Sequence, residues 1–329
     1  MKRGQGLNVM INKLFDGVSS RTILAPMAGY TDLAFRKICH SYGAGLTVTE
    51  MVSSKALVMG NELSRKMLTR LPDDGTTFCQ IFGHEPSVMA DSVRLDEVGQ
   101  YEGIDINMGC PVRKIVSNGD GSALLESPTL AAKCISAVKL AAGDKPVSVK
   151  FRLGVCDDKN AVDFVKTCRD AGADFVTVHF RTRRQMYSGT ADYTKLPQIA
   201  SCGIPVFANG DVLSRERYMQ LKDSGAYGVS VGRGALGRPY IFAELIGAEY
   251  SFDLYSAIRF HTESLVQVFG DRVACNEMKK HIAYYLKGKR NAKNTTVAVM
   301  SAKTTAEMLG FVDSFLRDNP QFAAAGSPS

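Results

Sequence analysis

Between residues 22 and 233 the chain repeats one pattern: a short apolar segment, a polar or glycine-rich break, and a longer stretch with helical periodicity. The apolar segments predict eight strands. These are Thr22–Ala25, Leu46–Glu50, Thr77–Phe82, Ile104–Asn107, Val147–Arg152, Phe175–Phe180, Val206–Ala208 and Gly228–Val231. The intervening stretches predict helices at Asp32–Tyr42, Pro86–Val98, Pro128–Ala141, Ala161–Ala171, Thr194–Ala200 and Arg215–Ser224.

Strict alternation of eight strands with helices over about 210 residues is typical of a closed parallel barrel. An open doubly wound sheet more often carries a G-x-G-x-x-G turn after its first strand. Here the first strand runs into Pro26-Met27-Ala28-Gly29 instead. The pattern therefore predicts an α/β protein with a (β/α)8 TIM barrel.

The pattern changes after Pro239, where helical periodicity continues without a convincing strand. The helical segments are Ile241–Gly247, Leu254–Phe269, Asn276–Leu286 and Thr295–Leu316. They predict a small all-helical C-terminal domain. We expect a catalytic barrel domain at residues 1–240, a helical domain at 250–322, and a disordered tail at 323–329.

The most informative stretch is Ile104–Pro111, whose first half alternates apolar and polar residues like a short buried strand. Pro111 cannot continue a ladder, so the Gly-Cys-Pro break lifts Cys110 out of the strand. A lone cysteine is often a buried structural residue, and that interpretation stays open. The polar Asn107 beside the thiol, and similar strand ends downstream, favour a catalytic Cys110.

Active sites of such barrels lie at the carboxyl ends of the strands. After the last two predicted strands come Asn209-Gly210-Asp211 and Gly232-Arg233, at the place where barrels commonly bind phosphate. The alternative for the second segment is a turn without a ligand. Lys150 lies inside an otherwise apolar strand, so it either extends to the barrel rim or faces an anionic group.

Two further strand-end side chains suit a flavin. Gln80 offers a donor and an acceptor to an amide-like ring edge. His179 ends its strand and is either a satisfied core histidine or part of the same site. A phosphate site, an in-strand lysine and amide side chains together suggest flavin mononucleotide (FMN) across the barrel mouth.

Composition narrows the class of protein. Apolar residues make up 45% of the chain and charged residues 22%, as in soluble globular proteins. We find neither a membrane-spanning run nor a signal segment, and we expect a cytoplasmic protein. The eight cysteines form no C-x-x-C pair and do not cluster with histidines, so we expect neither a metal site nor a disulfide framework.

A net charge of +7 suits a polyanionic partner. Part of the surplus lies in one predicted helical region, where basic residues alternate with aromatic ones. These residues are Lys279, Lys280, His281, Tyr284, Tyr285, Lys287, Lys289, Arg290 and Lys293. A solvated helix face is one interpretation of this pattern, and contact with an RNA backbone is the other.

The chain resembles the flavin-dependent tRNA-dihydrouridine synthases of the bacterial type. The matching segments, in the family's order, are Ala25–Asp32, Gly45–Met51, Asp105–Pro111, Gly121–Leu125, Lys150–Arg152, His179–Arg183, Asn209–Asp211 and Gly232-Arg233. The helical C-terminus is similar to the family's RNA-binding domain. The resemblance implies FMN, NADPH or NADH as reductant, and reduction of the C5–C6 double bond of specific uridines in tRNA.

The resemblance also implies roles for residues, with Cys110 as the catalytic acid that protonates C5. The implied flavin contacts are Pro26, Met27, Ala28, Gln80, Lys150, His179, Asn209, Gly210, Asp211, Gly232 and Arg233. The expected substrate contacts are Asn107, Arg152, Arg181, Lys279, Lys280, Lys287 and Arg290. We expect a monomer.

Two positions depart from the family pattern. Asn118 stands where many relatives carry a lysine, and Phe180 replaces a glycine after the histidine. Two rival functions remain: an FMN barrel enzyme for a free pyrimidine such as dihydroorotate, and a non-catalytic RNA-binding protein. A basic helical appendage has no use in the first, and bound flavin would count against the second.

Overall fold

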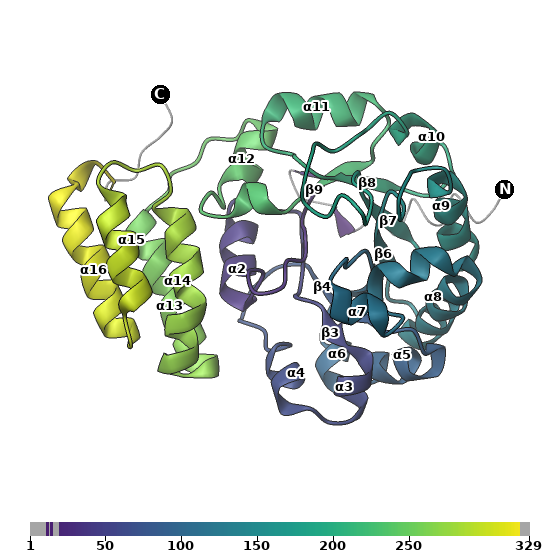
Figure 1. The fold of residues 1–329 in the computed structure, drawn as a ribbon, viewed down its shortest axis with the longest axis horizontal. Helices are drawn as coiled ribbons and strands as arrows, with labels where there is room; N and C mark the ends of the chain where they lie inside the picture. Colours follow the sequence, from purple (N-terminus) through teal and green to yellow (C-terminus); the bar gives the residue numbers. More distant parts are fainter. Residues whose placement is uncertain (1–10, 13, 16–19, 323–329) are drawn as a thin grey trace.

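The computed structural model describes residues 11, 12, 14, 15 and 20–322. In this part of the chain, parallel strands form a closed barrel with helices around it (Figure 1). The strands are β1 Thr22–Leu24, β2 Leu46–Val48, β3 Val52–Ser53, β4 Thr77–Phe82, β5 Gly103–Met108, β6 Val147–Arg152, β7 Phe175–His179, β8 Val206–Asn209 and β9 Gly228–Val231. β1 pairs with β2 and β9, and β2 pairs with β4, so the ring closes and β3 is a short addition beside β4.

Helices follow the strands and continue beyond the barrel. Those of the barrel part are α2 Leu33–Ser41, α3 Ser54–Val58, α4 Glu62–Lys66, α5 Pro86–Val93, α6 Asp96–Gly99, α7 Arg113–Ser117, η1 Gly121–Glu126, α8 Pro128–Ala142, α9 Ala161–Asp170, α10 Leu196–Ala200, α11 Arg215–Asp223, η2 Arg233–Ala235 and α12 Ile241–Ile246. The C-terminal ones are α13 Leu254–Phe269, α14 Asp271–Tyr285, α15 Ala292–Ser301, α16 Thr305–Asp318 and η3 Pro320–Phe322.

The predicted TIM barrel with a helical C-terminus is confirmed, and the errors in the elements are local. β3 and the short helices α3, α4 and α7 were not predicted, because elements of two to five residues carry little periodicity. Predicted helix Pro86–Val98 is two helices, and Thr295–Leu316 is also two, separated where the Thr304 side chain caps α16. The predicted tail at 323–329 lies outside the described residues.

The amino end of the barrel is closed by aromatic side chains. Phe175 packs 5.7 Å from Phe78 and 5.2 Å from Phe207, and all three are buried. Gly103 and Gly228 begin two strands there because a Cβ at either position would overlap the Phe78 or Phe207 ring. This end of the barrel is therefore filled with apolar side chains and leaves no room for a ligand.

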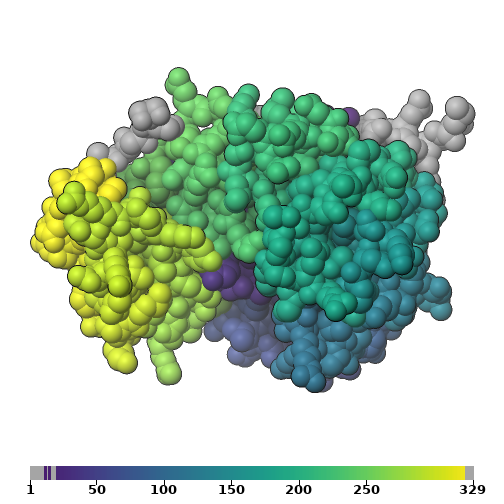
Figure 2. All heavy atoms as spheres, turned by 45° about the horizontal axis from the view of Figure 1, so that its top comes forward, coloured from purple at the N-terminus to yellow at the C-terminus, as the bar shows by residue number. Residues whose placement is uncertain are grey.

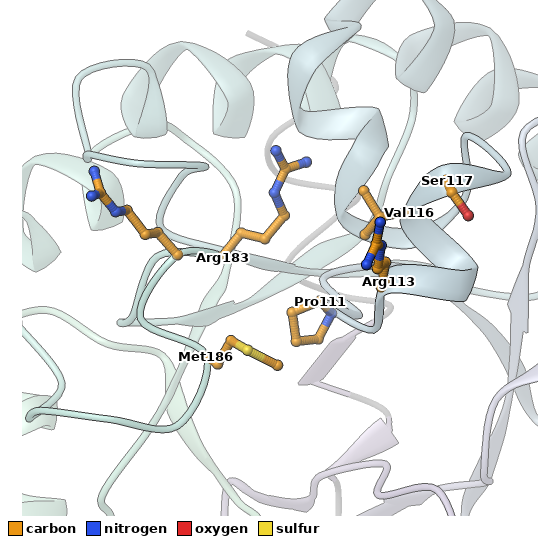
Figure 3. A pocket seen from close by; sticks show the side chains of 7 residues that line it. Pro111, Arg113, Val116, Ser117, Arg183 and Met186 are labelled. Carbon is orange, nitrogen blue, oxygen red and sulfur yellow. The ribbon is translucent and has the colours of Figure 1, made fainter.

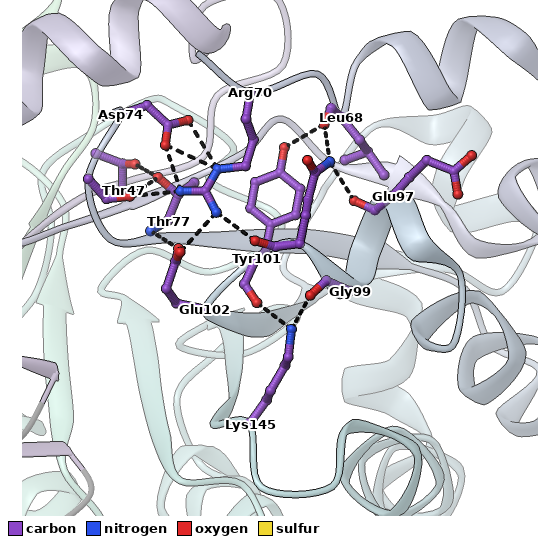
Figure 4. Close-up of polar contacts among 12 residues, drawn as sticks. Thr47, Leu68, Arg70, Asp74, Thr77, Glu97, Gly99, Tyr101, Glu102 and Lys145 are labelled. Atoms are coloured by element: carbon purple, nitrogen blue, oxygen red, sulfur yellow. Dashed lines mark hydrogen bonds and ion pairs between the residues drawn. The ribbon is translucent and has the colours of Figure 1, made fainter. Parts of the chain in front are cut away.

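A polar network fixes the loops at the same end (Figure 4). Arg70 donates hydrogen bonds to Asp74 and Glu102, and its guanidinium lies over the ring of Tyr101. Lys145 donates to the carbonyls of Gly99 and Tyr101. Every charged group in this network has a partner, so it serves to hold the loops in place.

The C-terminal helices pack around an apolar core of their own, centred on residues such as Ile258, Met278 and Phe315. Leu33 of α2 also belongs to this core, so the first barrel helix is one of the contacts between the two parts. In Figure 2 a hollow separates the yellow-green helices from the teal and green barrel, and purple atoms of the early chain lie at its floor. The predicted boundaries of the two domains stay a prediction.

Candidate functional site

A chain of hydrogen bonds links the barrel interior to the Cys110 turn. Ser148 and Gln80 donate to the two oxygens of Asp105, at 2.5 and 2.6 Å. Asn107 Nδ2 donates to Gln80 Oε1 at 3.0 Å, and Asn107 Oδ1 accepts from the backbone N–H of Gly109 and of Cys110. The side chain of Asn107 therefore shapes the turn that presents the thiol.

Asp105 was missed by the sequence reasoning, although a signal existed. It is a charged residue between two isoleucines in a strand, the same type of anomaly that singled out Lys150. Burial raises the pKa of Asp105, while its bonds to Ser148 and Gln80 and the charge of Lys150 oppose that rise. Its position beneath the site makes it an anchor for Gln80 and, through Gln80, for Asn107.

Cys110 is half-buried at the carboxyl end of β5. Burial raises its pKa, and the Val112 N–H, Arg152 and Lys150 only partly oppose this. The side chain is therefore a thiol at neutral pH, which suits a proton donor and does not suit a nucleophile. Behind it, Gly121 has a φ of +58°, and a Cβ there would lie 3.1 Å from the Cys110 Cβ.

Lys150 and His179 lie on neighbouring strands beside this turn. Asn107 is in register with Lys150, and Arg152 with His179. Burial and the adjacent Arg152 lower the pKa of Lys150 to about 8. Burial and the charge of Lys150 lower the pKa of His179 to about 2, so the imidazole is neutral.

Among the interactions of the described residues, the Lys150 amine has no hydrogen-bond or ion-pair partner, and neither ring nitrogen of His179 has one. Leaving such groups unsatisfied in a partly buried site costs stability. An anionic ring edge placed against Lys150 would remove that cost. This is the feature of the site that fits the pyrimidine edge of a flavin.

The loops after β8 and β9 form the other end of the site. Arg181 donates to both oxygens of Asp211, at 2.9 and 2.7 Å, and Arg233 lies 3.5 Å from the same carboxylate. Gly210 and Asp211 both have positive φ, at 122° and 47°. Among the described residues, the backbone N–H groups of Gly210, Asp211, Gly232 and Arg233 have no acceptor. This arrangement suits a phosphate bound by main-chain N–H groups.

Several predicted contacts are already engaged within the protein. Asn209 Nδ2 donates to the Ser230 carbonyl, and Asp211 is held by Arg181, so their side chains support the loop. Arg152 is buried and donates to the carbonyls of Gly109, Thr182 and Met186. We therefore assign Arg152 and Arg181 to positioning the loops around the site, since most of their donors have protein acceptors.

The loop after β1 and helix α14 complete the rim. Pro26 and Met27 are partly exposed and Ala28 is exposed, and Met27 Sδ lies near Gly232 of the β9 loop. Gly29 donates its N–H to Glu50 at 2.5 Å, and Lys280 of α14 lies against Gly29 and over the ring of Tyr30. Burial raises the pKa of Glu50 to about 7. Sequence reasoning had placed Lys280 on the RNA-binding helix and not at the barrel mouth.

The basic helix differs from its prediction in one respect. Lys287 and Arg290 are exposed, and Lys279 is half-buried. His281 and Tyr285, however, are only 1% and 2% exposed, so these two aromatic side chains cannot contact an RNA. Both side chains lie on the face of α14 that points inward, where they contribute to its packing against α2.

A pocket of about 380 Å³ opens beside Pro111, the residue after Cys110 (Figure 3). It is lined by Pro111, Arg113, Val116, Ser117, Arg183, Arg184 and Met186. Arg183 pairs with Glu126 at 2.7 Å, whereas Arg113 and Arg184 form no ion pair with a described residue. The sequence reasoning had not selected these arginines.

Within the described residues, no helix is both long and apolar enough to cross a membrane.

Comparisons with known proteins agree with this geometry. Residues 23–318 match the family model described as dihydrouridine synthase. A probable tRNA-dihydrouridine synthase of Rickettsia conorii is 38% identical over 299 residues, covering 86% of this chain and 89% of the relative. A tRNA-dihydrouridine synthase B of Xanthomonas campestris pv. campestris is 36% identical over 323 residues, covering 94% and 96%. The solved structure of morphinone reductase shares the fold, with a TM-score of 0.51 at 11% identity over 69% of this chain and 86% of that one.

Proposed function

The chain belongs to the dihydrouridine synthase family, a family of flavin-dependent oxidoreductases, and we propose that it reduces the C5–C6 double bond of specific uridines in tRNA. We further propose FMN as the flavin and NADPH, or alternatively NADH, as the reductant. The observation that carries the proposal is the position of the Cys110 thiol, held beside the unpartnered Lys150 at the carboxyl end of the barrel.

The site offers two places of contact for FMN, one for its ring and one for its phosphate. Lys150 would meet the ring edge that becomes anionic on reduction, with Gln80 and His179 beside it. The free N–H groups of Gly210, Asp211, Gly232 and Arg233 would hold the phosphate, with the Arg233 guanidinium next to them. Pro26, Met27 and Ala28 line the rim between these ends. A mononucleotide needs one such phosphate site, which favours FMN over a dinucleotide flavin.

When bound, reduced flavin supplies the hydride that adds to C6 of the uracil ring. The proton that completes the addition at C5 comes from the Cys110 thiol, leaving a thiolate that solvent reprotonates. Asn107 holds the turn that aims the thiol, and Arg152 fixes the same turn through the Gly109 carbonyl. Since the base must reach the barrel mouth, the uridine has to leave its stack in the RNA.

For RNA recognition, we propose that the helical domain contacts phosphates through Lys279, Lys287 and Arg290. Lys280 sits nearer to the reacting base, because it contacts Gly29 and Tyr30 at the barrel rim. The division into a catalytic barrel at 1–240 and an RNA-binding domain at 250–322 belongs to this proposal. So do a monomeric state and a cytoplasmic location.

The decisive experiment is single-turnover oxidation of pre-reduced Cys110→Ala enzyme by unmodified tRNA. The variant should retain FMN and still be reduced by NADPH, because neither step uses the thiol. Oxidation by tRNA should slow by roughly 10²–10⁴-fold, the usual contribution of a positioned general acid. Wild-type rates in the folded variant would exclude Cys110 as the acid.

The cofactor needs its own measurement. Flavin released by heating the purified protein should be FMN, and Arg233→Ala and Lys150→Ala should each weaken its retention while the barrel stays folded. FAD, or no flavin, in the supernatant would contradict the proposed phosphate site. Turnover of a free pyrimidine in place of tRNA would support the rival small-molecule enzyme.

A further inference from the structure

A second cluster of ligand-type side chains lies where the helical domain meets the barrel. It consists of Asp32, the residue before α2, together with His261 of α13 and His281 of α14. One ligand atom from each lies within 4.8 Å of the other two. His261 Nε2 is 2.9 Å and His281 Nε2 is 3.4 Å from the same atom, Asp32 Oδ2. The proposed reaction uses none of the three.

Aromatic rings shield the two histidines from water, while the Asp32 side chain is 12% exposed. His261 and His281 are 0% and 1% exposed. The Phe35 ring packs 5.2 Å from His281 and 6.1 Å from His261, and Tyr30 packs 5.6 Å from His281. A carboxylate in such surroundings needs a cation. Among the described residues, no lysine or arginine forms an ion pair with Asp32.

The bonding of these groups is incomplete in a specific way. Asp32 Oδ1 caps α2 by accepting from the N–H groups of Ala34 and Phe35, at 2.9 and 3.0 Å. His261 Nε2 lies within hydrogen-bond distance of both Asp32 oxygens, at 3.1 Å from Oδ1 and 2.9 Å from Oδ2, and His281 Nε2 faces Oδ2. Both nitrogens of His281 lack a hydrogen-bond partner, because the 3.4 Å contact of Nε2 does not have hydrogen-bond geometry. A buried imidazole without partners is costly, and buried polar groups in native proteins rarely remain in that state.

We propose that Asp32, His261 and His281 bind one divalent transition-metal ion, with zinc as the best match, and that this ion ties α13 and α14 to the start of α2. Imidazole nitrogen and carboxylate oxygen are zinc ligands, and bond lengths of about 2.0–2.1 Å place tetrahedral ligands about 3.3 Å apart. The separations of 2.9 and 3.4 Å lie on either side of that value. The ion gives His281 Nε2 its partner and Asp32 its cation.

The protonation states agree with this geometry. Burial and the neighbouring His261 lower the pKa of His281 to about 4, so its nitrogen is free to coordinate. The sequence reasoning expected no metal site because the cysteines form no C-x-x-C pair and do not cluster with histidines. It did not consider Asp32, His261 and His281, which are far apart in the chain.

The test is the metal content of the refolded protein, because a largely buried site should fill as the chain folds. Chain without a histidine tag is refolded with FMN and Zn²⁺, desalted, and analysed by mass spectrometry for metals. We expect one zinc per chain in the wild type and its loss in His281→Gln and His261→Gln. His40→Gln is the matched control, since His40 lies on α2 outside the cluster and contacts the Ala44 carbonyl; it should keep its zinc.

Two further measurements use the wild type and do not depend on the folding of variants. Refolding with Co²⁺ should give visible d–d absorption bands of a four-coordinate nitrogen and oxygen site. Heating with a chelator should lower Tm by several degrees relative to heating without it. The proposal is overturned if the wild-type protein refolds and binds neither zinc nor cobalt in stoichiometric amount. In that case Asp32, His261 and His281 interact through protons and not through a metal. Zinc that persists in both histidine variants overturns it as well, by placing the metal elsewhere. Neither result bears on the proposed reaction of Cys110.

Discussion

At the amino end of the barrel, Arg70 donates to Asp74, Glu102 and two carbonyl oxygens, and its guanidinium lies over Tyr101. At the carboxyl end, Lys150 lies among other cations with no partner among the described residues. The two ends are only one strand length apart and are built from the same strands. The amino end satisfies its charges and is filled with phenylalanine rings, whereas the carboxyl end pairs Arg181 with Asp211 but leaves Lys150 without a partner.

The difference separates residues that stabilise the fold from residues that need a ligand. Charges with complete partners contribute to holding loops in place. Charges that are partly buried and unpaired lower stability, and they persist where a ligand supplies the missing partner. Substitutions at the two ends should therefore have opposite consequences for stability and for flavin binding.

The largest effect on stability should come from the aromatic end. Phe207→Ala removes a fully buried ring that packs against Phe175 and Tyr227, and we expect a decrease of about 3–5 kcal/mol in the free energy of unfolding. Urea unfolding monitored by circular dichroism measures it. The folded fraction should still bind FMN with wild-type stoichiometry. Loss of FMN beyond the unfolded fraction would mean that the two ends are not separable.

The second largest effect should come from Arg70→Met. We expect the free energy of unfolding to decrease by about 3 kcal/mol, because the buried Asp74 carboxylate loses its partner. Arg94→Met is the control, since Arg94 and Asp91 form an ion pair in which both side chains are exposed. It should change stability by less than about 0.5 kcal/mol. Equal decreases in the two variants would contradict the argument that burial decides the cost.

In flavin-free protein, Lys150→Met should increase the free energy of unfolding, whereas the two preceding substitutions decrease it. Below pH 8 both the folded and the unfolded wild type carry a charged Lys150, so burying that charge disfavours the wild type relative to the variant. Because the pKa of Lys150 falls from 10.5 to about 8 on folding, the unfolded state binds more protons between pH 8 and 10.5. The stability of the wild type relative to the variant should therefore increase as pH rises through this window. A pH-independent difference in urea midpoint would show that the amine is solvated.

The smallest effect on stability should come from the exposed basic residues Lys287 and Arg290, which follow α14. Lys287→Ala with Arg290→Ala should weaken tRNA binding several-fold and flatten its salt dependence. The slope of log affinity against log salt should fall by roughly 0.7–0.9 for each phosphate that is no longer neutralised. FMN content and NADPH oxidation should be unchanged, because both side chains are exposed and lie outside the barrel mouth. Filter binding at several salt concentrations gives the slope, and an unchanged slope would remove these two residues from the RNA interface.

The sequence by itself determined the elements whose signals are local. Short apolar segments between polar or glycine-rich breaks located the barrel strands, and Pro111 after a strand predicted the turn that exposes Cys110. Asp32 was expected to begin a helix and does cap α2. In-strand charge marked Lys150 correctly as an anomaly. These features depend on neighbours within a few residues, so a single sequence is enough to show them.

The tertiary structure alone decided which side chains meet. Arg181 and Asp211 are 30 residues apart in the chain, and nothing in either segment predicts that they pair. Lys280 was assigned to an RNA-binding face, yet the packing of α14 brings it against Gly29 and Tyr30 at the barrel rim. Asp32 and His261 are 229 residues apart. Contacts at such separations depend on how whole helices pack, and packing leaves no periodic pattern in the chain.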